Sequence, residues 1–304
     1  MDEPRACVRH PDRPAVTVCA RCGRPSCIED LVEAPVGYQC VDCTRDAAPV
    51  RRLGDPVPTP TVTRALVGLI VLVALLGTTG AVDIRTFGLV PVLVGSGEWW
   101  RLLTSALLHG GLFHLAFNGL LLWRLGQLLE PRLGGPTFLG LVVSGTAGGG
   151  LGVVALSWLV VATPIGTIPA AATLLGAGPF SVTVGASGAV FGLMGAVLVL
   201  LRRRGLDPWA TAEGSTVGGL VVLNLILTVV IPSISVGGHV GGLLGGAAAA
   251  LTIRSPVWTV GGAGTAVDRD RTARGDATRT GAVALALVVA ASLLAGGLLR
   301  ALGG

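Results

Sequence analysis

The sequence has little charge, no lysine and few aromatic residues. Only 13% of its 304 residues are charged and 4% are aromatic, whereas about 25% of the residues in a typical soluble domain are charged. The apolar residues come in long blocks, and the mean hydropathy is +0.75. This is the composition of a membrane protein rather than a soluble domain. The 47 glycines fit that class, because small residues let membrane helices approach closely.

All 22 basic residues are arginines, and the formal net charge is +5. A basic balance can indicate nucleic-acid binding. The arginines of this chain flank its apolar blocks, however, which is where basic residues set membrane topology. We therefore expect no nucleic-acid partner. We also expect no cleavable signal peptide, because the first forty or so residues are polar and rich in cysteine.

Seven apolar segments are candidates for membrane-spanning helices, which need about 20 apolar residues. They are residues 64–82, 108–129, 137–161, 185–201, 215–232, 237–253 and 280–299. If the N-terminus is cytoplasmic, most arginines fall on the cytoplasmic side, as the positive-inside rule requires. The sequence therefore predicts an all-α, multi-pass protein of the cell membrane, with its N-terminus in the cytoplasm and its C-terminus outside.

Composition further divides the chain into five parts. Residues 45–63 are rich in proline and cannot bury a core, so they are expected to form a linker. The other expected parts are a cytoplasmic metal-binding module (1–44), a core of six membrane helices (64–253), a cytoplasmic loop (254–279), and a seventh helix with a tail (280–304).

Strongly polar side chains inside membrane spans are costly, so each is a candidate for function. In the predicted topology the second, fourth and sixth helices all run inward, and their first turns share one depth near the outer face. His114 and Asn118 lie in the first half of the second helix, Ser187 opens the fourth, and His239 opens the sixth. We expect these groups to meet, with Ser187 as nucleophile and His239 as general base.

Small neighbours favour that meeting. Ser187 lies between small residues, and Gly238, Gly242 and Gly246 repeat at every fourth position, a pattern that favours close helix contact. Asn118 lies one turn after His114, so it is a candidate donor to an oxyanion, together with the backbone N–H of Ser187.

Taken alone, each of these residues has a simpler interpretation. A serine in an apolar helix usually bonds to its own backbone, and a buried histidine often packs or relays protons. We expect Asn224 to link helices and Glu130, beside Arg132, to be a structural partner.

Several motifs occur together between residues 98 and 246. They are Trp100-Arg101, His109-Gly110-Gly111, His114-x-x-x-Asn118, Gly126 to Glu130, Gly185-x-Ser187-Gly188 and Gly238-His239-x-x-Gly242. In order and spacing this segment resembles the rhomboid intramembrane serine proteases.

The resemblance implies a six-helix core with a seventh C-terminal helix, and a Ser–His dyad that cleaves transmembrane proteins. Ser187 would attack the substrate carbonyl and His239 would take its proton, while Asn118, His114 and the Ser187 amide would stabilise the oxyanion. Many family members have a tyrosine where this chain has Phe191, so the resemblance implies that a ring still stacks on His239 without a hydroxyl.

The N-terminal module contains four pairs of candidate metal ligands at x₂ spacing. The pairs are Cys7/His10, Cys19/Cys22, Cys27/Asp30 and Cys40/Cys43. Tetrahedral Zn²⁺ takes four such ligands, so the eight predict two structural zinc ions. The order resembles the cross-braced B-box type of zinc finger, which implies that pairs one and three share an ion, as do pairs two and four. Either Asp30 or Glu29 completes the first site.

A disulfide scaffold is the alternative for these cysteines, but it does not suit the cytoplasmic side. So small a module depends on metal to fold, and it is expected to bind a cytoplasmic protein rather than to catalyse.

Two other functions compete with a protease that works in the lipid bilayer without a catalytic cofactor. One is a catalytically silent rhomboid-like scaffold that binds or escorts membrane proteins, for which an intact Ser/His/Asn set would be unnecessary. The other is a transporter, which predicts inverted repeats and acidic residues at mid-membrane that the sequence lacks. We therefore predict an intramembrane serine endopeptidase with transmembrane protein substrates.

Overall fold

The computed structural model describes residues 6–20, 22–34, 37–45, 59–164, 175–203, 205–231, 234–254 and 266–303. Residues 46–58 of the predicted linker and residues 255–265 of the predicted loop lie outside this set. Contacts divide the chain into two units, the smaller containing the N-terminal module and the larger containing residues 57–258 and 271–304.

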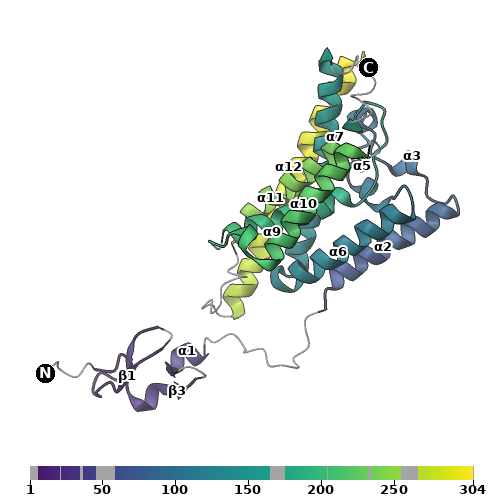
Figure 1. Ribbon diagram of the computed structural model, residues 1–304. Helices are drawn as coiled ribbons and strands as arrows, with labels where there is room; N and C mark the ends of the chain where they lie inside the picture. Colours follow the sequence, from purple (N-terminus) through teal and green to yellow (C-terminus); the bar gives the residue numbers. More distant parts are fainter. Residues whose placement is uncertain are drawn as a thin grey trace. The chain divides into compact units, whose positions relative to one another are not determined.

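The N-terminal module consists of two small antiparallel sheets and short helical turns (Figure 1). Its elements are β1 (Thr17–Val18), β2 (Pro25–Ser26), the 3₁₀ turn η1 (Ile28–Asp30), β3 (Leu31–Glu33), β4 (Tyr38–Cys40) and α1 (Val41–Arg45). β1 pairs with β2, and β3 pairs with β4. Four of its six cysteines, Cys7, Cys19, Cys27 and Cys40, are buried, so sulfur atoms take the place of an apolar core.

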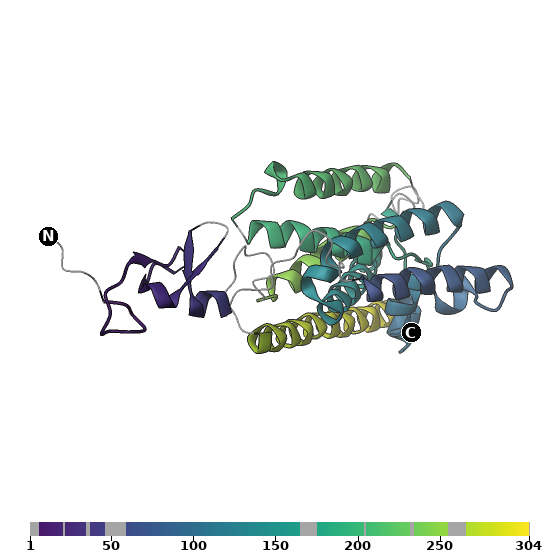
Figure 2. The ribbon, with the colours of Figure 1, turned by 90° about the horizontal axis from the view of Figure 1, so that it is seen from below.

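Helices make up most of the described residues of the larger unit. Its long helices are α2 (Thr61–Thr78), α6 (Leu112–Leu133), α7 (Gly135–Ala162), α9 (Ser187–Arg202), α10 (Ala212–Val230), α11 (Val236–Leu251) and α12 (Ala266–Ala301). α2 lies beside α6 (Figure 1), and Figure 2 shows α10 and α12 at opposite edges of the unit. Each of the seven predicted segments overlaps one of these helices, with ends that differ by a few residues in all but the last, so the all-α prediction for the membrane region is confirmed.

Length separates the helices into two groups. Among the described residues, α2, α7, α10 and the part of α12 from Arg274 are long and apolar enough to span a bilayer. A fifth span results if residues 101–107, which meet α6 at 100°, are counted with it. α9 and α11 have 16 residues each, and both carry many buried glycines and alanines. These two short helices therefore belong to the packed centre of the unit.

Short helices fill the segment between α2 and α6. They are α3 (Ile84–Phe87), α4 (Pro91–Gly95), α5 (Arg101–Thr104) and η2 (Ser105–Leu107). The Arg101 side chain is buried, pairs with Glu98 at 2.6 Å, and donates to the carbonyls of Arg85 and Gly88 at 2.9 and 2.8 Å. One guanidinium thus satisfies several groups at once and fixes the shape of this segment.

The last helix begins earlier than its apolar pattern predicts. α12 starts at Ala266, whereas the predicted span starts at 280 and residues 254–279 were expected to be a loop. Contacts with the end of α11 hold the extra turns. The Asp276 carboxylate accepts the backbone N–H of Arg254 at 2.7 Å, and Arg279, which pairs with Asp276, donates to the carbonyl of Thr252 at 2.8 Å. Polar tertiary contacts thus extend a helix beyond its apolar region.

Glu130 is a structural residue, but its partner is not the neighbouring Arg132. The Glu130 carboxylate accepts the backbone N–H groups of Val62 and Thr63, both at 2.8 Å, and the Thr63 hydroxyl at 2.6 Å. Arg132 instead donates to the carbonyl of Leu128. The first N–H groups of a helix have no partner within it, so a carboxylate from α6 caps the beginning of α2.

Replacing Glu130 by alanine should therefore weaken the contact between α2 and α6 and destabilise the fold. Buried donors would be left unsatisfied, which costs about 3 kcal/mol. We expect a clear fall in the thermal unfolding midpoint of the detergent-solubilised protein, a smaller fall for Glu130→Gln, and almost none for Arg132→Ala. Equal midpoints for Glu130→Ala and Arg132→Ala would contradict this role.

Candidate active site and candidate metal centres

Glycines bring α7, α9 and α11 into contact at the level of their backbones. A Cβ atom added to Gly242 of α11 would lie 2.4 Å from the carbonyl oxygen of Gly188 in α9. One added to Gly237 would lie 2.5 Å from the carbonyl oxygen of Gly152 in α7. No larger residue fits at these points without moving a helix. Ser187 precedes one of these contacts and His239 lies between them along the chain.

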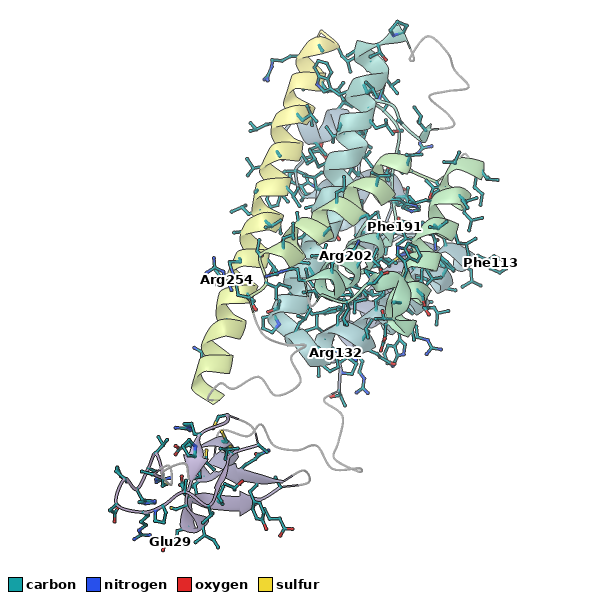
Figure 3. The ribbon with its side chains drawn as sticks, turned by 60° about the vertical axis from the view of Figure 1, so that its left-hand side comes forward. Glu29, Phe113, Arg132, Phe191, Arg202 and Arg254 are labelled. Atoms are coloured by element: carbon teal, nitrogen blue, oxygen red, sulfur yellow. The ribbon has the colours of Figure 1, made fainter. Side chains whose placement is uncertain are left out.

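His239 stacks on a ring that lies one turn from Ser187. The imidazole is 7% exposed, and its centroid is 4.2 Å from that of Phe191, with 23° between the planes. This confirms the expected stacking, and Figure 3 marks Phe191 within the helical unit. Ser187 is the first residue of α9 and is half-buried. Residues four apart share one face of a helix, so the hydroxyl-bearing face of α9 is the face that His239 covers. No hydrogen bond joins Ser187 to His239 in the described structure.

One nitrogen of the His239 ring, Nδ1, has a partner that the sequence does not predict. Nδ1 of His239 lies 2.6 Å from the hydroxyl of Thr228, which is 1% exposed, and that hydroxyl lies 2.6 Å from the carbonyl oxygen of Asn224. The sequence carries no clear signal for this contact, because a threonine in an apolar helix usually bonds only to its own helix. The Asn224 side chain itself donates to the carbonyl of Leu220 in the same helix at 2.8 Å, so its expected role as a link between helices stays a prediction.

His114 and Asn118 face the segment that leads into Ser187. A Cβ atom on Gly185 would lie 2.6 Å from Cε1 of His114 and 3.8 Å from Nδ2 of Asn118. Gly185 also has a φ of +124°, which few other residues adopt. The buried Asn118 amide donates to the carbonyl of His114 at 3.0 Å, which occupies one of its two N–H groups. The glycine thus leaves room for both side chains beside the beginning of α9.

His109, the first residue of the His109-Gly110-Gly111 motif, joins the same group. Its ring meets that of His114 edge-on at 5.1 Å, and the backbone N–H of Ala186 points to its Nε2 at 3.5 Å. Ala186 is the residue that precedes Ser187 at the helix start. His109 therefore packs between the candidate oxyanion residues and the beginning of α9.

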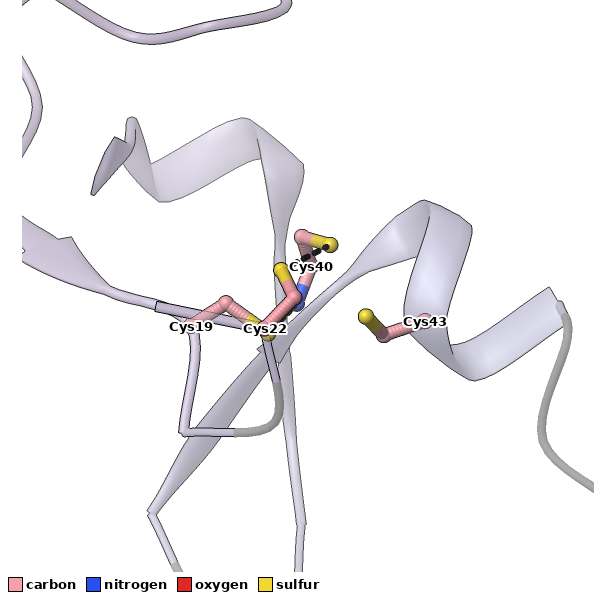
Figure 4. A group of neighbouring side chains, drawn as sticks. All are labelled: Cys19, Cys22, Cys40 and Cys43. Carbon is pink, nitrogen blue, oxygen red and sulfur yellow. Dashed lines mark hydrogen bonds between the residues drawn. The ribbon is translucent and has the colours of Figure 1, made fainter. Parts of the chain in front are cut away.

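Four thiols form the first candidate metal centre. The sulfur atoms of Cys19, Cys22, Cys40 and Cys43 all lie within 4.8 Å of one another (Figure 4). The sulfurs of Cys22 and Cys40 are 3.8 Å apart. Tetrahedral zinc with Zn–S bonds of about 2.3 Å places its sulfurs roughly 3.8 Å apart, so the donor set fits Zn²⁺.

Further donors to the sulfur atoms suit thiolates. The backbone N–H of Cys40 points to the sulfur of Cys19 at 3.2 Å, and Nε of Arg24 points to the sulfur of Cys22 at 3.3 Å. The hydrogen bond from Arg24 lowers the pKa of Cys22 below its ordinary value. Since metals bind the deprotonated sulfur, these contacts favour the form that a metal requires.

A second group contains Cys7, His10 and Cys27. Their ligand atoms also lie within 4.8 Å of one another, and Nδ1 of His10 is 3.3 Å from the sulfur of Cys27. The cysteine groups could therefore bind metal at two places. The group as described has three members and does not include a carboxylate.

The two candidates for a fourth ligand both face arginines. Asp30 is 4% exposed and its carboxylate lies 3.4 Å from Arg9, whereas Glu29 pairs with Arg13 at the surface. Of the two, Asp30 is the buried one, and it is the last residue of η1, the turn that begins directly after Cys27.

Comparison with known proteins gives a consistent result. The rhomboid domain matches residues 96–256, slightly more than half of the chain. The chain is 32% identical over 204 residues to the rhomboid protease GluP of Bacillus subtilis, which covers 65% of this chain and 36% of GluP. It is 34% identical over 164 residues to rhomboid-like protease 1 of Toxoplasma gondii (51% of this chain, 47% of that protein) and 33% identical over 159 residues to RHOMBOID-like protein 5 of Arabidopsis thaliana (51% and 44%).

The chain thus spans only about a third to a half of the length of these three curated relatives. The matched region nevertheless contains the helices α6, α7, α9, α10 and α11, and with them the group around Ser187 and His239. From the family match and its apolar helices, this chain is a multi-pass membrane protein that belongs to the rhomboid family.

Proposed function

We propose that this chain is a serine endopeptidase that cleaves transmembrane proteins within the bilayer, with Ser187 as nucleophile and His239 as base. The observation that carries the proposal is the stacking of His239 on Phe191, one helical turn from Ser187, at a glycine contact between α9 and α11. Relatives named rhomboid proteases support it.

In the proposed reaction the Ser187 hydroxyl attacks the substrate carbonyl while Nε2 of His239 takes its proton. His239 then returns the proton to the leaving amine, and a water molecule hydrolyses the acyl-enzyme by the same route. This reaction requires a hydrogen bond between Ser187 and His239, which would form when substrate binds. Hydrogen bonds between catalytic groups are often long before substrate binds and shorten in the complex. The stacking on Phe191 keeps the imidazole beside α9.

The negative charge on the substrate oxygen needs donors that are already in place. We propose that the second N–H of the Asn118 amide, the His114 ring and the Ser187 backbone N–H supply them. Asn118 is 3% exposed, so its donor would act in a site with little water, where electrostatic stabilisation is strong.

Several further assignments rest on the same proposal. The arginine pattern supports a cytoplasmic N-terminus and an outer C-terminus, which would put Ser187 near the outer face. Residues 1–44 would be a cytoplasmic zinc module for a protein partner, 45–63 a linker, 64–253 the six-helix protease core, and 254–279 a cytoplasmic segment before the final span (280–304).

Replacing Ser187 by alanine should abolish labelling by a fluorophosphonate probe and lower proteolysis by at least about a thousandfold. The probe forms its bond only with an activated serine, so gel fluorescence of the purified protein measures the effect. Ser292→Ala is the matched control, since Ser292 lies in an apolar helix and its hydroxyl bonds, among the described residues, to the carbonyl of Val288 in the same helix, at 2.9 Å. Labelling that persists in Ser187→Ala would contradict the assignment of Ser187 as nucleophile, because another serine would then carry the reactivity.

Substrates can be sought with the same variant. Membrane proteomes of cells that carry the wild-type protein or Ser187→Ala should differ in shortened forms of single transmembrane proteins. An identical pattern of fragments in the two cell lines would contradict cleavage of transmembrane substrates.

For the N-terminal module we propose two structural zinc ions, one held by Cys19, Cys22, Cys40 and Cys43, and one by Cys7, His10 and Cys27 with Asp30 as the fourth ligand. Zinc would supply folding energy and no chemistry, because protein ligands fill every position. The full chain purified without chelators should contain about two zinc ions by elemental mass spectrometry.

The double variant Cys22→Ser, Cys43→Ser should lose about one of these ions and keep the other. Its fluorophosphonate labelling should be unchanged, since the metal has no catalytic role in the proposal. Metal content near zero in the wild-type protein would refute the zinc assignment without affecting the protease assignment.

A further inference from the structure

Thr228 occupies the position that a third catalytic partner would take, although it carries no charge. It lies in the last turn of α10, is 1% exposed, and makes two short contacts through one oxygen. Its hydroxyl is 2.6 Å from Nδ1 of His239 and 2.6 Å from the carbonyl oxygen of Asn224. His239 and Asn224 are each 7% exposed, so both contacts lie in the interior of the helical unit.

A hydroxyl has one proton, and this fixes the direction of both hydrogen bonds. The carbonyl oxygen of Asn224 can only accept, so the Thr228 proton points to it. The Thr228 oxygen must then accept from His239, which puts a proton on Nδ1. The reverse arrangement would point an oxygen lone pair at a carbonyl oxygen 2.6 Å away, which is repulsive.

With the proton on Nδ1, a neutral imidazole has its lone pair on Nε2. Nε2 is the nitrogen that the proposed reaction needs as base. One face of the ring is covered by Phe191 and its Nδ1 edge is held by Thr228, so the ring is fixed both in plane and in tautomer.

We propose that Thr228 is a positioning residue that keeps His239 in the Nδ1–H tautomer and aims Nε2 at Ser187, an inference that rests on the proposed protease function. The same contact serves both protonation states, because Nδ1 stays a donor when His239 becomes imidazolium. Thr228 therefore orients the His239 ring as an acidic residue would, but without a charge.

The test compares two substitutions of Thr228. Thr228→Val keeps the shape of the side chain but loses the oxygen, and Thr228→Ser keeps the oxygen but loses the methyl group. Thr216→Val is the matched control, since Thr216 lies in the same helix and its hydroxyl bonds, within the part of the chain that the structure describes, to the carbonyl of Ala212, at 2.8 Å. The rate constant for fluorophosphonate labelling should fall by at least about tenfold in Thr228→Val, and stay near the wild-type value in Thr228→Ser and Thr216→Val.

A second measurement reads the tautomer directly and does not depend on activity. ¹⁵N NMR of the full-length protein with labelled histidine, assigned with His239→Asn, should show a protonated Nδ1 and an unprotonated Nε2 for wild-type and Thr228→Ser. Thr228→Val should shift this pattern toward a protonated Nε2.

The outcomes separate the inference from the proposed function. A protonated Nε2 in the wild type, or wild-type labelling by Thr228→Val, would overturn the role of Thr228. Equal loss of labelling in Thr228→Ser and Thr228→Val would do the same, because it would indicate packing rather than hydrogen bonding. A wild-type protein that the probe does not label would instead overturn the protease proposal, while the NMR result would still decide the tautomer.

Discussion

The contact of three helices through their glycines is the constraint on which the rest of the structure depends. Water drives apolar helices together in soluble proteins, but lipid gives no such force, so close packing must supply the attraction. α7, α9 and α11 achieve it by removing side chains where they cross. A Cβ atom on Gly246 would lie 2.0 Å from the carbonyl oxygen of Gly192, and one on Gly152 would lie 2.1 Å from that of Gly237. Dispersion and weak C–H···O contacts between backbones then act over the full crossing.

This close approach explains why α9 and α11 are short and why their polar residues cluster. Two helices of 16 residues each are enclosed by longer neighbours, so neither has to span the whole apolar layer. Their first turns carry Ser187 and His239, and the Phe191–His239 stack fills the space beside the glycines. Packing therefore brings polar groups together at a depth where each alone would be costly.

Much of this arrangement could be predicted from local sequence, and the remainder depends on contacts between distant residues. The repeat of Gly238, Gly242 and Gly246 predicts a helix contact, because a helix face without side chains lets a neighbouring backbone approach closely. The partner of Glu130 could not be predicted, since the beginning of α2 lies far away in the sequence and Arg132 is the nearer cation. The early start of α12 depends in the same way on Asp276, whose carboxylate reaches Arg254 only in the folded chain. The contact of Thr228 with His239 could not be predicted, because the bond from its hydroxyl to the Asn224 carbonyl is the one that most threonines in apolar helices make.

The neutral partner of His239 follows from the same physics as the glycine contact. A carboxylate beside the ring would orient it more strongly, but an ionised group buried among apolar helices loses its hydration and must be compensated by further donors. The Arg101 and Glu130 networks illustrate how many partners such a charge demands. A threonine needs only the carbonyl one turn earlier in its own helix, which is always available. In the proposed protease, a hydroxyl anchored in this way would orient His239 without adding a charge, so that the geometry of a catalytic triad would need only one ionisable and one nucleophilic side chain.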